Sequence, residues 1–409
     1  MNFMWKDGRP VILDGATGMN LQKAGMPAGV CPEQWVIEHS DALKALQRDF
    51  VRAGSNAVYA PTFGANRVKL KKYGLDGRTA EMNRELVALS REAVGEGVAV
   101  GGDMTSLGLF IEPFGTESFD DIVEIYREQA QALSEAGVDF FIAETIMQLF
   151  EARAALLAVR SVSDKPFFVS ITVEQNGRML GGTEPLAALS VMQGMGADAF
   201  GLNCSDGPAE IAAIIESIAP YAQIPLLAKP NAGMPCVGED GSSHYHMTPE
   251  AFAAYAPRLT AAGTADLGGC CGTEPVHIAA LAAACAAQTV APPRAAAAFA
   301  ATDKAAFVFD APPPVRPAEN ESASMADAIA DCEADDGEVV FLRLRSEEDA
   351  EEFQENQYLL RNPICLLTNE AALLDRALFA YQGRAFVSGD GSADSALAEA
   401  ARKYGAILI

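Results

Sequence analysis

Three of the eight cysteines in the 409-residue sequence stand where they could bind a metal ion together. Cys204 ends one apolar run, and the neighbouring residues Cys270 and Cys271 follow another inside a glycine-rich segment. Three thiolates with a fourth position left open are the ligand set of a catalytic zinc site rather than a structural one. The flanking glycines let the backbone bend so that adjacent cysteines can face one ion. We therefore predict a Zn²⁺ site at these three residues.

The other thiols are interpreted differently. A buried cysteine is commonly a small core residue, and we assign this role to Cys31, Cys236, Cys285, Cys332 and Cys365. His244 and His246 could form a metal pair, but they stand in a polar stretch that favours a solvated loop. The N-terminus lacks the basic and then apolar layout of a secretory signal, so we expect reduced thiols, no disulfide framework and a cytoplasmic protein.

The elements that must position the thiols are eight short apolar runs. These runs are Val11–Thr17, Ala57–Phe63, Val98–Met104, Phe140–Thr145, Phe167–Val173, Ala199–Cys204, Leu226–Asn231 and Ala265–Gly269. Their continuous hydrophobicity is typical of strands buried on both faces. Helical patterns separate them, at 32–53, 118–136, 148–162, 208–218 and 248–262 among others. Eight strand–helix units within residues 1–289 predict an α/β fold, a (β/α)8 TIM barrel.

An open, doubly wound sheet is the alternative fold. It would usually carry a glycine-rich phosphate turn after its first strand, and Asp14-Gly15-Ala16-Thr17-Gly18 does not fit G-x-G-x-x-G. In a barrel, the carboxyl ends of the strands form one rim, where barrel enzymes carry out their chemistry. The three thiols therefore meet at this rim. Other polar residues that we expect there are Asp14, Thr62, Asp103, Glu144, Thr172, Glu174 and Asn231.

The composition limits the possible partners and divides the chain. A formal net charge of −25 argues against nucleic acid and anionic membranes, and no apolar run approaches the roughly 20 residues of a membrane span. We expect a barrel at 1–289, an acidic, Pro/Ala-rich solvated linker at 290–336, and a small β/α domain at 337–409. The strands expected in that domain are Glu338–Leu344, Pro363–Thr368, Arg384–Ser388 and Ala406–Ile409.

Several rim motifs resemble those of the zinc-dependent homocysteine S-methyltransferase family. The resemblance is strongest to the branch of cobalamin-dependent methionine synthases, whose N-terminal barrel binds homocysteine. These motifs are Asp14-Gly15-Ala16-Thr17-Gly18, Pro61-Thr62-Phe63-Gly64-Ala65-Asn66, Glu144-Thr145, Gly181-Gly182-Thr183-Glu184-Pro185, Gly201-Leu202-Asn203-Cys204-Ser205, Lys229-Pro230-Asn231-Ala232-Gly233 and Gly268-Gly269-Cys270-Cys271-Gly272-Thr273. Two positions depart from the family: Pro61 stands where Asn is common, and Gly102-Asp103-Met104 replaces a Gly-Ser-Leu-type turn.

The resemblance implies a role for each rim residue. Cys204, Cys270 and Cys271 would bind Zn²⁺, and the sulfur of L-homocysteine would take the open position, which the Asn231 oxygen fills when substrate is absent. Glu144, with help from Asp14, would hold the substrate ammonium group. Backbone N–H groups of the Asp14-Gly15 turn, with Thr62, would hold its carboxylate. The alternatives are that Glu144 is the structural partner of a basic residue and that Thr62 only completes a strand.

The methyl donor implied by the resemblance is methylcobalamin on a separate corrinoid protein. The Asp-x-His-x-x-Gly element of corrinoid-binding domains is absent, because none of the four histidines follows an Asp by two residues. S-methylmethionine or betaine as a direct donor is one alternative, and a non-catalytic zinc- or thiol-binding assembly component is another. Residues 338–409 weakly resemble a fragment of a pterin-binding barrel without its pterin residues. We expect no folate binding there, but a role in packing, dimerisation or partner docking.

Overall fold

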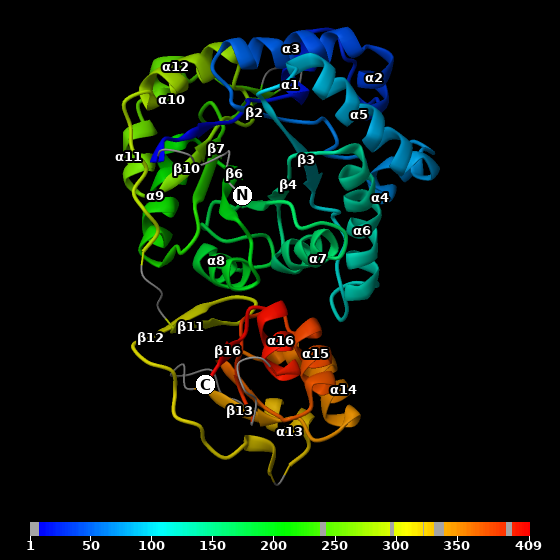
Figure 1. Cartoon of the computed structure of the whole chain (residues 1–409), viewed down its shortest axis with the longest axis vertical. Helices are drawn as coiled ribbons and strands as arrows, with labels where there is room; N and C mark the ends of the chain where they lie inside the picture. The colour runs from blue at the N-terminus through cyan, green and yellow to red at the C-terminus, as the bar shows by residue number, and fades with distance from the viewer. Residues whose placement is uncertain (1–7, 238–242, 295–297, 322, 331–338, 390–394) are drawn as a thin grey trace. The chain divides into compact units, whose positions relative to one another are not determined.

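The computed structural model describes residues 8–237, 243–294, 298–321, 323–330, 339–389 and 395–409, which form two compact units (Figure 1). The first unit comprises Met1–Asn176 and Asp198–Arg294, and the second comprises Gly177–Ala197 and Ala295–Ile409. Within the described residues, no helix is long and apolar enough to span a lipid bilayer.

The first unit is built on a sheet of eight parallel strands. Their order in the sheet is β1-β10-β7-β6-β5-β4-β3-β2. The strands are β1 (Val11–Ile12), β2 (Ala57–Tyr59), β3 (Ala99–Thr105), β4 (Phe140–Ile146), β5 (Phe167–Ile171), β6 (Ala199–Cys204), β7 (Leu226–Pro230) and β10 (Thr264–Leu267). All eight lie where the sequence predicted them, and the α/β TIM-barrel fold is confirmed.

Hydrogen bonds from side chains and backbone join β1 and β2, which stand at the two ends of the strand order in this nearly closed barrel. Asn56 donates its backbone N–H to the Ile12 carbonyl (2.7 Å), and its side-chain oxygen accepts the Ile12 N–H (2.9 Å). The Ser55 hydroxyl donates to the Leu13 carbonyl (3.0 Å), and the Tyr59 N–H donates to Asp14 (2.8 Å). Polar side chains thus take the place of a continuous ladder between β1 and β2.

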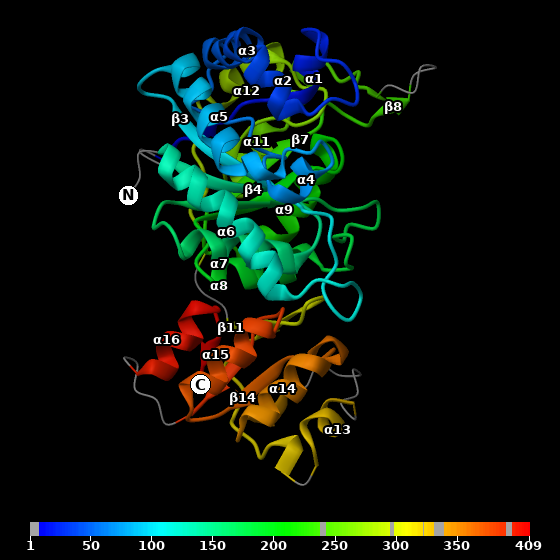
Figure 2. The ribbon, with the colours of Figure 1, turned by 90° about the vertical axis from the view of Figure 1, so that its right-hand side faces the viewer.

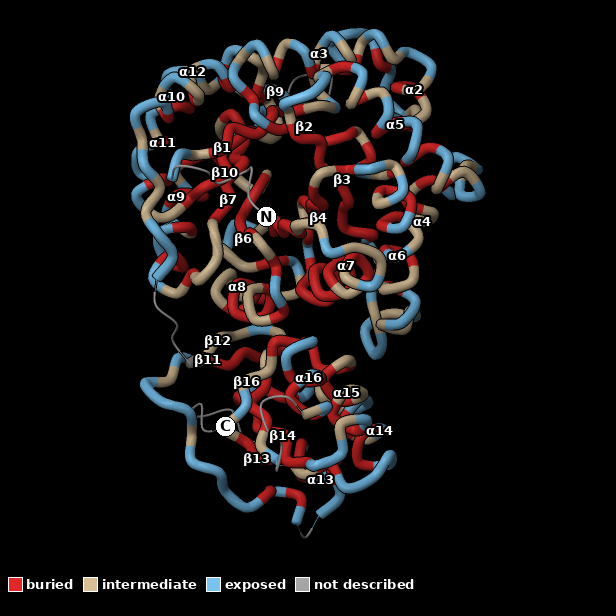
Figure 3. Tube along the Cα trace, viewed as in Figure 1, coloured by how far each residue is buried: buried red, intermediate tan, exposed pale blue. Residues whose placement is uncertain are grey.

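Aromatic and aliphatic side chains fill the interior of the barrel. Phe140 stacks on Phe168 with 4.9 Å between ring centroids, and Tyr59 meets Phe140 edge-on at 6.0 Å. The same buried cluster contains Val11, Leu13, Ala57, Ala99, Ile142, Ala199 and Leu227. Figure 3 shows the barrel strands buried along most of their length. Strands that are covered on both faces explain the continuous apolar runs in the sequence.

Helices follow the strands and form the outer layer, in which α6 (Phe119–Ala136) packs between α5 (Thr79–Val94) and α7 (Leu149–Arg160) (Figures 1 and 2). Other long helices of this unit are α3 (Ser40–Arg52), α9 (Pro208–Ile218) and α12 (Pro275–Cys285), whereas α1 (Gly18–Lys23) and α4 (Arg67–Lys71) are short. Helix α6 begins with a capping box formed by Ser118 and Asp121.

Two expected helices are each divided in two. The pattern at 32–53 forms α2 (Pro32–Glu38) and α3 (Ser40–Arg52), because His39 leaves the helical region (ψ 46°) and stacks its ring on Trp35. The pattern at 248–262 forms α10 (Pro249–Ala253) and α11 (Ala256–Ala261). Pro257 has no N–H to extend the preceding helix, so a second helix starts beside it.

The second unit contains a four-stranded parallel sheet in the order β13-β14-β15-β16. Its strands are β13 (Val340–Arg343), β14 (Ile364–Leu367), β15 (Phe386–Ser388) and β16 (Ile407–Leu408), and its helices include α8 (Pro185–Gly194), α14 (Glu347–Asn356), α15 (Ala371–Ala380) and α16 (Ala396–Lys403). Strands occur at all four expected places, although residue 338 lies outside the described residues.

The segment 290–336 is more ordered than the expected solvated linker. It contains the antiparallel hairpin of β11 (Ala298–Ala301) and β12 (Ala306–Phe309), and the helix α13 (Met325–Ala330). Ala300 and Met325 are fully buried. The short apolar run Ala306 to Phe309, which follows the polar residues Thr302 to Lys304, was the available sequence signal for this hairpin.

We expect Ser55→Ala to lower the unfolding free energy of the barrel by about 1–3 kcal/mol, because the buried Leu13 carbonyl loses the donor that closes the seam. Trp35 is buried in the first unit, so urea unfolding followed by tryptophan fluorescence reports on that unit. Ser217→Ala, which removes an exposed hydroxyl, is the control and should change stability by less than about 0.5 kcal/mol. Equal effects of the two substitutions would contradict this role of Ser55.

Candidate functional site

The structure brings the three cysteines of the predicted metal site together at the carboxyl ends of the strands. The sulfur atoms of Cys204, Cys270 and Cys271 all lie within 4.8 Å of one another, and Cys204 and Cys271 are 4.0 Å apart. Cys204 is the last residue of β6, and the other two cysteines follow β10. Among the described residues, no other group of three metal-ligating side chains is as close.

An uncommon backbone conformation positions Cys204. Cys204 (φ 56°), Ser205 (φ 52°) and Thr145 (φ 57°) are the described non-glycine residues in the left-handed region. Such residues cost of the order of 1–3 kcal/mol each and persist where the surroundings hold them. Asn203 provides that support, since its side chain accepts the Thr145 N–H (2.9 Å) and the Ser170 hydroxyl (2.8 Å). The ends of β4, β5 and β6 are thereby fixed together.

Backbone hydrogen bonds hold the vicinal cysteines. Cys270 donates its N–H to the Pro230 carbonyl (2.8 Å), and the Cys271 carbonyl accepts the Ala232 N–H (2.9 Å). Gly268 passes so close to Asp14 that a Cβ would stand 2.7 Å from the Asp14 carbonyl oxygen. A glycine is therefore required there, which accounts for part of the glycine-rich sequence before the thiols.

In the absence of a cation, the three thiols hold their protons. The Cys270 and Cys271 thiols act on Cys204 in opposite directions, and with burial the pKa of Cys204 is raised to about 11. The Cys204 thiol and burial raise the pKa of Cys270 above the usual range of thiols. For Cys271, the stabilising contact with Cys204 is outweighed by Cys270 and burial, and the pKa is about 12. A metal ion would reverse this preference, since bound thiols are deprotonated.

The residues present fit a zinc ion. The three soft donors leave one tetrahedral position open, as expected for a catalytic site. Asn231 is 2% exposed, and its Oδ1 finds no hydrogen-bond partner within the described parts of the chain. Its side chain also contacts the Cys204 thiol. An orphaned buried oxygen beside three thiols is a suitable fourth donor.

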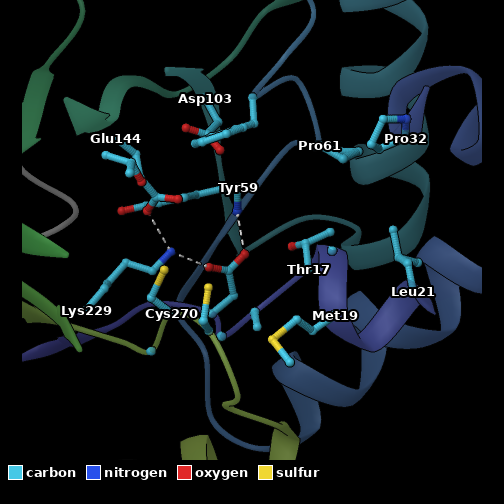
Figure 4. Close-up of a pocket in the computed structure, with 18 of the residues that line it drawn as sticks. Thr17, Met19, Leu21, Pro32, Tyr59, Pro61, Asp103, Glu144, Lys229 and Cys270 are labelled. Atoms are coloured by element: carbon cyan, nitrogen blue, oxygen red, sulfur yellow. Dashed lines mark hydrogen bonds and ion pairs between the residues drawn. The ribbon is translucent and has the colours of Figure 1, made fainter. Parts of the chain in front are cut away.

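A cavity of about 450 Å³ opens beside the thiols (Figure 4). This volume lies in the range of small-molecule sites, about 300–1,000 Å³. Residues lining it include Asp14, Gly15, Thr17, Met19, Leu21, Glu33, Tyr59, Phe63, Asp103, Glu144, Cys204, Lys229, Cys270 and Cys271. The wall is apolar at Met19 and Leu21 of α1. It is acidic at Asp14, Asp103 and Glu144, which we call the acidic wall.

A buried lysine organises the acidic wall. Lys229 is 3% exposed, and its Nζ lies 3.0 Å from Asp14 Oδ1 and 3.2 Å from Glu144 Oε2 (Figure 4). The same ammonium group stands over the face of the Tyr59 ring, 3.6 Å from its centroid. One cation therefore meets two carboxylates and an aromatic face in a site from which water is largely excluded.

The buried groups shift one another's titration. Burial alone would lower the pKa of Lys229, but Asp14 and Glu144 hold it well above its usual value, so the lysine is charged. Burial raises the pKa of Glu144, and Lys229 opposes that rise. Burial, and then Glu144, raise the pKa of Asp103 well above its usual value. The acidic wall therefore holds more carboxyl groups than the single lysine can keep ionised.

The expected substrate-binding residues lie in and around this cavity. Gly15 lines it, and a Cβ there would stand 2.8 Å from both Phe50 and Thr273. Both Asp14 oxygens are engaged, one by the Tyr59 N–H and the other by Lys229. Thr62 is fully buried, and its hydroxyl donates to the Asp103 carbonyl (2.8 Å) and accepts the Asp103 N–H (3.0 Å).

The sequence analysis did not predict a site role for Lys229 or Tyr59, which contact the acidic wall. Lys229 stands in the motif that pointed to Asn231, and its place at the end of an apolar strand was the available signal. The basic partner that was considered for Glu144 is therefore present. Tyr59 carried no signal beyond its strand, because aromatic residues are common there.

The remaining sequence candidates lie apart from the thiol group. His244 and His246 are exposed, with their rings 6.5 Å apart. Tyr245 between them is half-buried, packs against Gly272 and hydrogen-bonds the Cys271 thiol. Of the other cysteines, Cys31, Cys285 and Cys365 are buried, Cys236 is exposed, and Cys332 lies outside the described residues.

The fold and the site define a (β/α)8 barrel with a three-thiol cluster and an adjoining small-molecule cavity at its carboxyl rim. The model of the homocysteine S-methyltransferase family matches residues 11–285, and the chain belongs to this family. It is 32% identical over 292 residues to the methionine synthase of Mycobacterium tuberculosis and 31% identical to that of Mycobacterium leprae. Each match covers 68% of this chain and 24% of the relative, so the chain spans about a quarter of their length.

Solved structures share the barrel fold. The metallated form of the homocysteine methyltransferase MmuM from Escherichia coli matches with a TM-score of 0.57 and 22% identity, over 68% of this chain and 96% of that one. Its oxidized form matches with a TM-score of 0.58 and 21% identity, over 69% and 97%. The likeness therefore extends over nearly all of the MmuM chain.

We expect the thiol cluster to bind one Zn²⁺ or Co²⁺ ion per chain and to release protons as it does so. Because the pKa values of the thiols are raised, metal affinity should increase with pH, by about tenfold per pH unit for each proton released. Calorimetry in buffers of different ionisation enthalpy measures that number. Cys236→Ser, at an exposed thiol, is the matched control for Cys271→Ser. Metal binding without proton release, or unchanged in Cys271→Ser, would contradict the assignment.

Proposed function

We propose that this chain transfers a methyl group to the thiol of L-homocysteine and forms methionine, with Zn²⁺ bound by Cys204, Cys270 and Cys271. The observation that carries the proposal is the convergence of these sulfur atoms within 4.8 Å, at the edge of a cavity with an acidic wall. Family membership supports the same acceptor. A cavity beside a tris-thiolate centre gives a small thiol access to the open position of the metal.

A bound zinc ion supplies a substrate thiolate near neutral pH, without a general base. The new sulfur–carbon bond forms as the bond between the methyl group and its donor breaks, and the electron pair of that bond leaves with the donor. The residues of the chain position the reacting sulfur and determine its surroundings. The left-handed turn at Cys204 directs one sulfur inward, and the apolar wall at Met19 and Leu21 limits water at the reacting sulfur.

The rest of the substrate would be held by the walls of the cavity. Its ammonium group requires carboxylates, which the acidic wall offers. Its carboxylate requires N–H donors, and the Asp14-Gly15 turn lines the cavity. Thr62 would act indirectly in this arrangement, by fixing the backbone of Asp103.

We expect Cys204→Ala to lose bound zinc and at least about 100-fold in homocysteine methylation, since even outer contacts of metal ligands are worth 10–100-fold. Methionine formation and metal content are measured on the same sample. Cys236→Ala removes an exposed thiol outside the cluster and should retain both properties. Full methylation by a zinc-free Cys204→Ala protein would exclude the mechanism. Zinc binding by the wild-type chain without methylation from any donor would favour the assembly component.

For the methyl donor, we propose methylcobalamin carried by a separate corrinoid protein. The mycobacterial relatives are methionine synthases about four times as long as the matched region, which leaves room for further functions in those chains. Partly exposed apolar residues in loops after the strands also offer a docking surface around the cavity, namely Phe63, Met147 and Met234. S-methylmethionine or betaine as a direct donor is the alternative.

Parallel assays with a methylated corrinoid protein, free methylcobalamin, S-methylmethionine and betaine distinguish these donors. We expect the highest kcat/KM with the corrinoid protein. Because a docked protein uses the rim, Met234→Glu should raise the KM for that protein while the KM for homocysteine stays within about twofold. The same substitution should leave reaction with free methylcobalamin nearly unchanged. Faster turnover with either small donor than with every corrinoid donor would assign the chain to direct transfer.

A further inference from the structure

The carboxyl group of Asp103 is buried in the cavity wall and has an oxygen without a hydrogen-bond partner among the described residues. The residue is 5% exposed and lines the cavity, and its Oδ1 finds no hydrogen-bond partner in the described part of the chain. The backbone around it is fixed, because the Thr62 hydroxyl bonds both its N–H and its carbonyl. Leaving a buried polar group unpaired costs about 1–3 kcal/mol, so the rigid placement of this carboxyl group calls for a ligand.

The neighbouring carboxyl groups already have partners. The two oxygens of Asp14 accept from the Tyr59 N–H and from Lys229. Glu33 also lines the cavity, but it accepts the Gly64 N–H and the Cys31 thiol. Glu144 meets Lys229 with one oxygen at 3.2 Å, a contact without hydrogen-bond geometry. Asp103 and Glu144 are therefore the acidic residues of the wall with capacity for another cation.

The positions of these two groups suit a shared ligand. Asp103 and Glu144 come from the adjacent strands β3 and β4, and Figure 4 shows their carboxyl groups near each other on the same wall. Lys229 is the one Lys or Arg among the described lining residues, and it lies on the Asp14 side of Glu144. The wall thus has a place for a second ammonium group, on the Asp103 side.

We propose that Asp103 and Glu144 together bind the α-ammonium group of the thiol substrate, and that Asp14 instead serves Lys229 and the barrel seam. This assignment rests on the proposed function and specifies its substrate recognition. It makes Asp103 a specificity-determining residue that selects α-amino thiols over thiols without an amino group. A site built around buried polar groups rejects a ligand that leaves them unpaired.

The electrostatics of the wall agree with this assignment. Burial and the Glu144 charge raise the pKa of Asp103, while Lys229 opposes them, and Asp14 and Glu33 add to the rise. The empty wall therefore favours a protonated Asp103. An ammonium ligand beside it would favour the carboxylate and complete the neutralisation that Lys229 begins.

The test compares homocysteine with 4-mercaptobutyrate, which has the same thiol and carboxylate but no amino group. Calorimetry on the zinc-loaded protein gives Kd for both ligands. We expect Asp103→Asn to weaken homocysteine binding about 10- to 100-fold, as for hydrogen bonds to charged groups, and to change 4-mercaptobutyrate binding less than about threefold. Glu144→Gln should act in the same way. Asp41→Asn, at an exposed position, is the matched control and should change neither Kd.

Asp103→Glu is the second variant, because it keeps the negative charge in case the amide perturbs the fold. It should retain a preference for homocysteine that Asp103→Asn loses. Asp103→Asn with wild-type affinity for homocysteine, or with equal losses for both ligands, would overturn the assignment of Asp103 and leave the proposed function intact. A wild-type protein that binds zinc but neither thiol would overturn the proposed function itself.

Discussion

One buried ammonium group, that of Lys229, connects the strand ends at the carboxyl rim of the barrel. Lys229, at the end of β7, meets Asp14 after β1 and Glu144 in β4, and Asp14 in turn accepts the Tyr59 N–H of β2. The Lys229 ammonium group, together with Asp14, thus connects β1, β2, β4 and β7, which are distant in sequence. Breaking such a buried pair leaves an uncompensated charge and typically costs 3–5 kcal/mol. The acidic wall of the cavity is therefore a structural element of the barrel as well as a surface for recognition.

The same cluster sets the electrostatics of the thiol centre. With Zn²⁺ bound as proposed, three thiolates around one divalent cation would carry a net negative charge. The carboxyl groups of the wall lie close enough for Glu144 to raise the pKa of Cys270. This negative charge favours a cationic group beside the metal. In the proposed arrangement, an ammonium-bearing thiol would bind with its sulfur at the metal and with its nitrogen at the wall, and so would use both parts of the site. A thiol without the nitrogen would use only the first.

The thiol cluster could be predicted because residue type and strand count were sufficient. Cys204 and the Cys270–Cys271 pair end strands of a fold whose carboxyl ends always share one rim. The pairing of charges could not be predicted in this way. A sequence shows that Asp14, Asp103, Glu144 and Lys229 end strands, but which carboxyl group faces the lysine depends on strand tilt and rotamers. The break at His39 depends likewise on ring stacking against Trp35, which helical periodicity does not reveal.

The methyl acceptor and the methyl donor of the proposed reaction would be bound by different parts of this barrel. In the proposed reaction the acceptor would be bound by buried groups at the ends of strands, such as Glu144 in β4 and Cys270 just after β10, whose backbone the sheet holds in place. The donor would approach from the open side, where the loops carry Phe63, Met147 and Met234, each more than a third exposed. Loops vary more readily than strands. A single thiol site can therefore serve different methyl donors across a family, because changes in the loops leave Lys229 and its carboxylates in place.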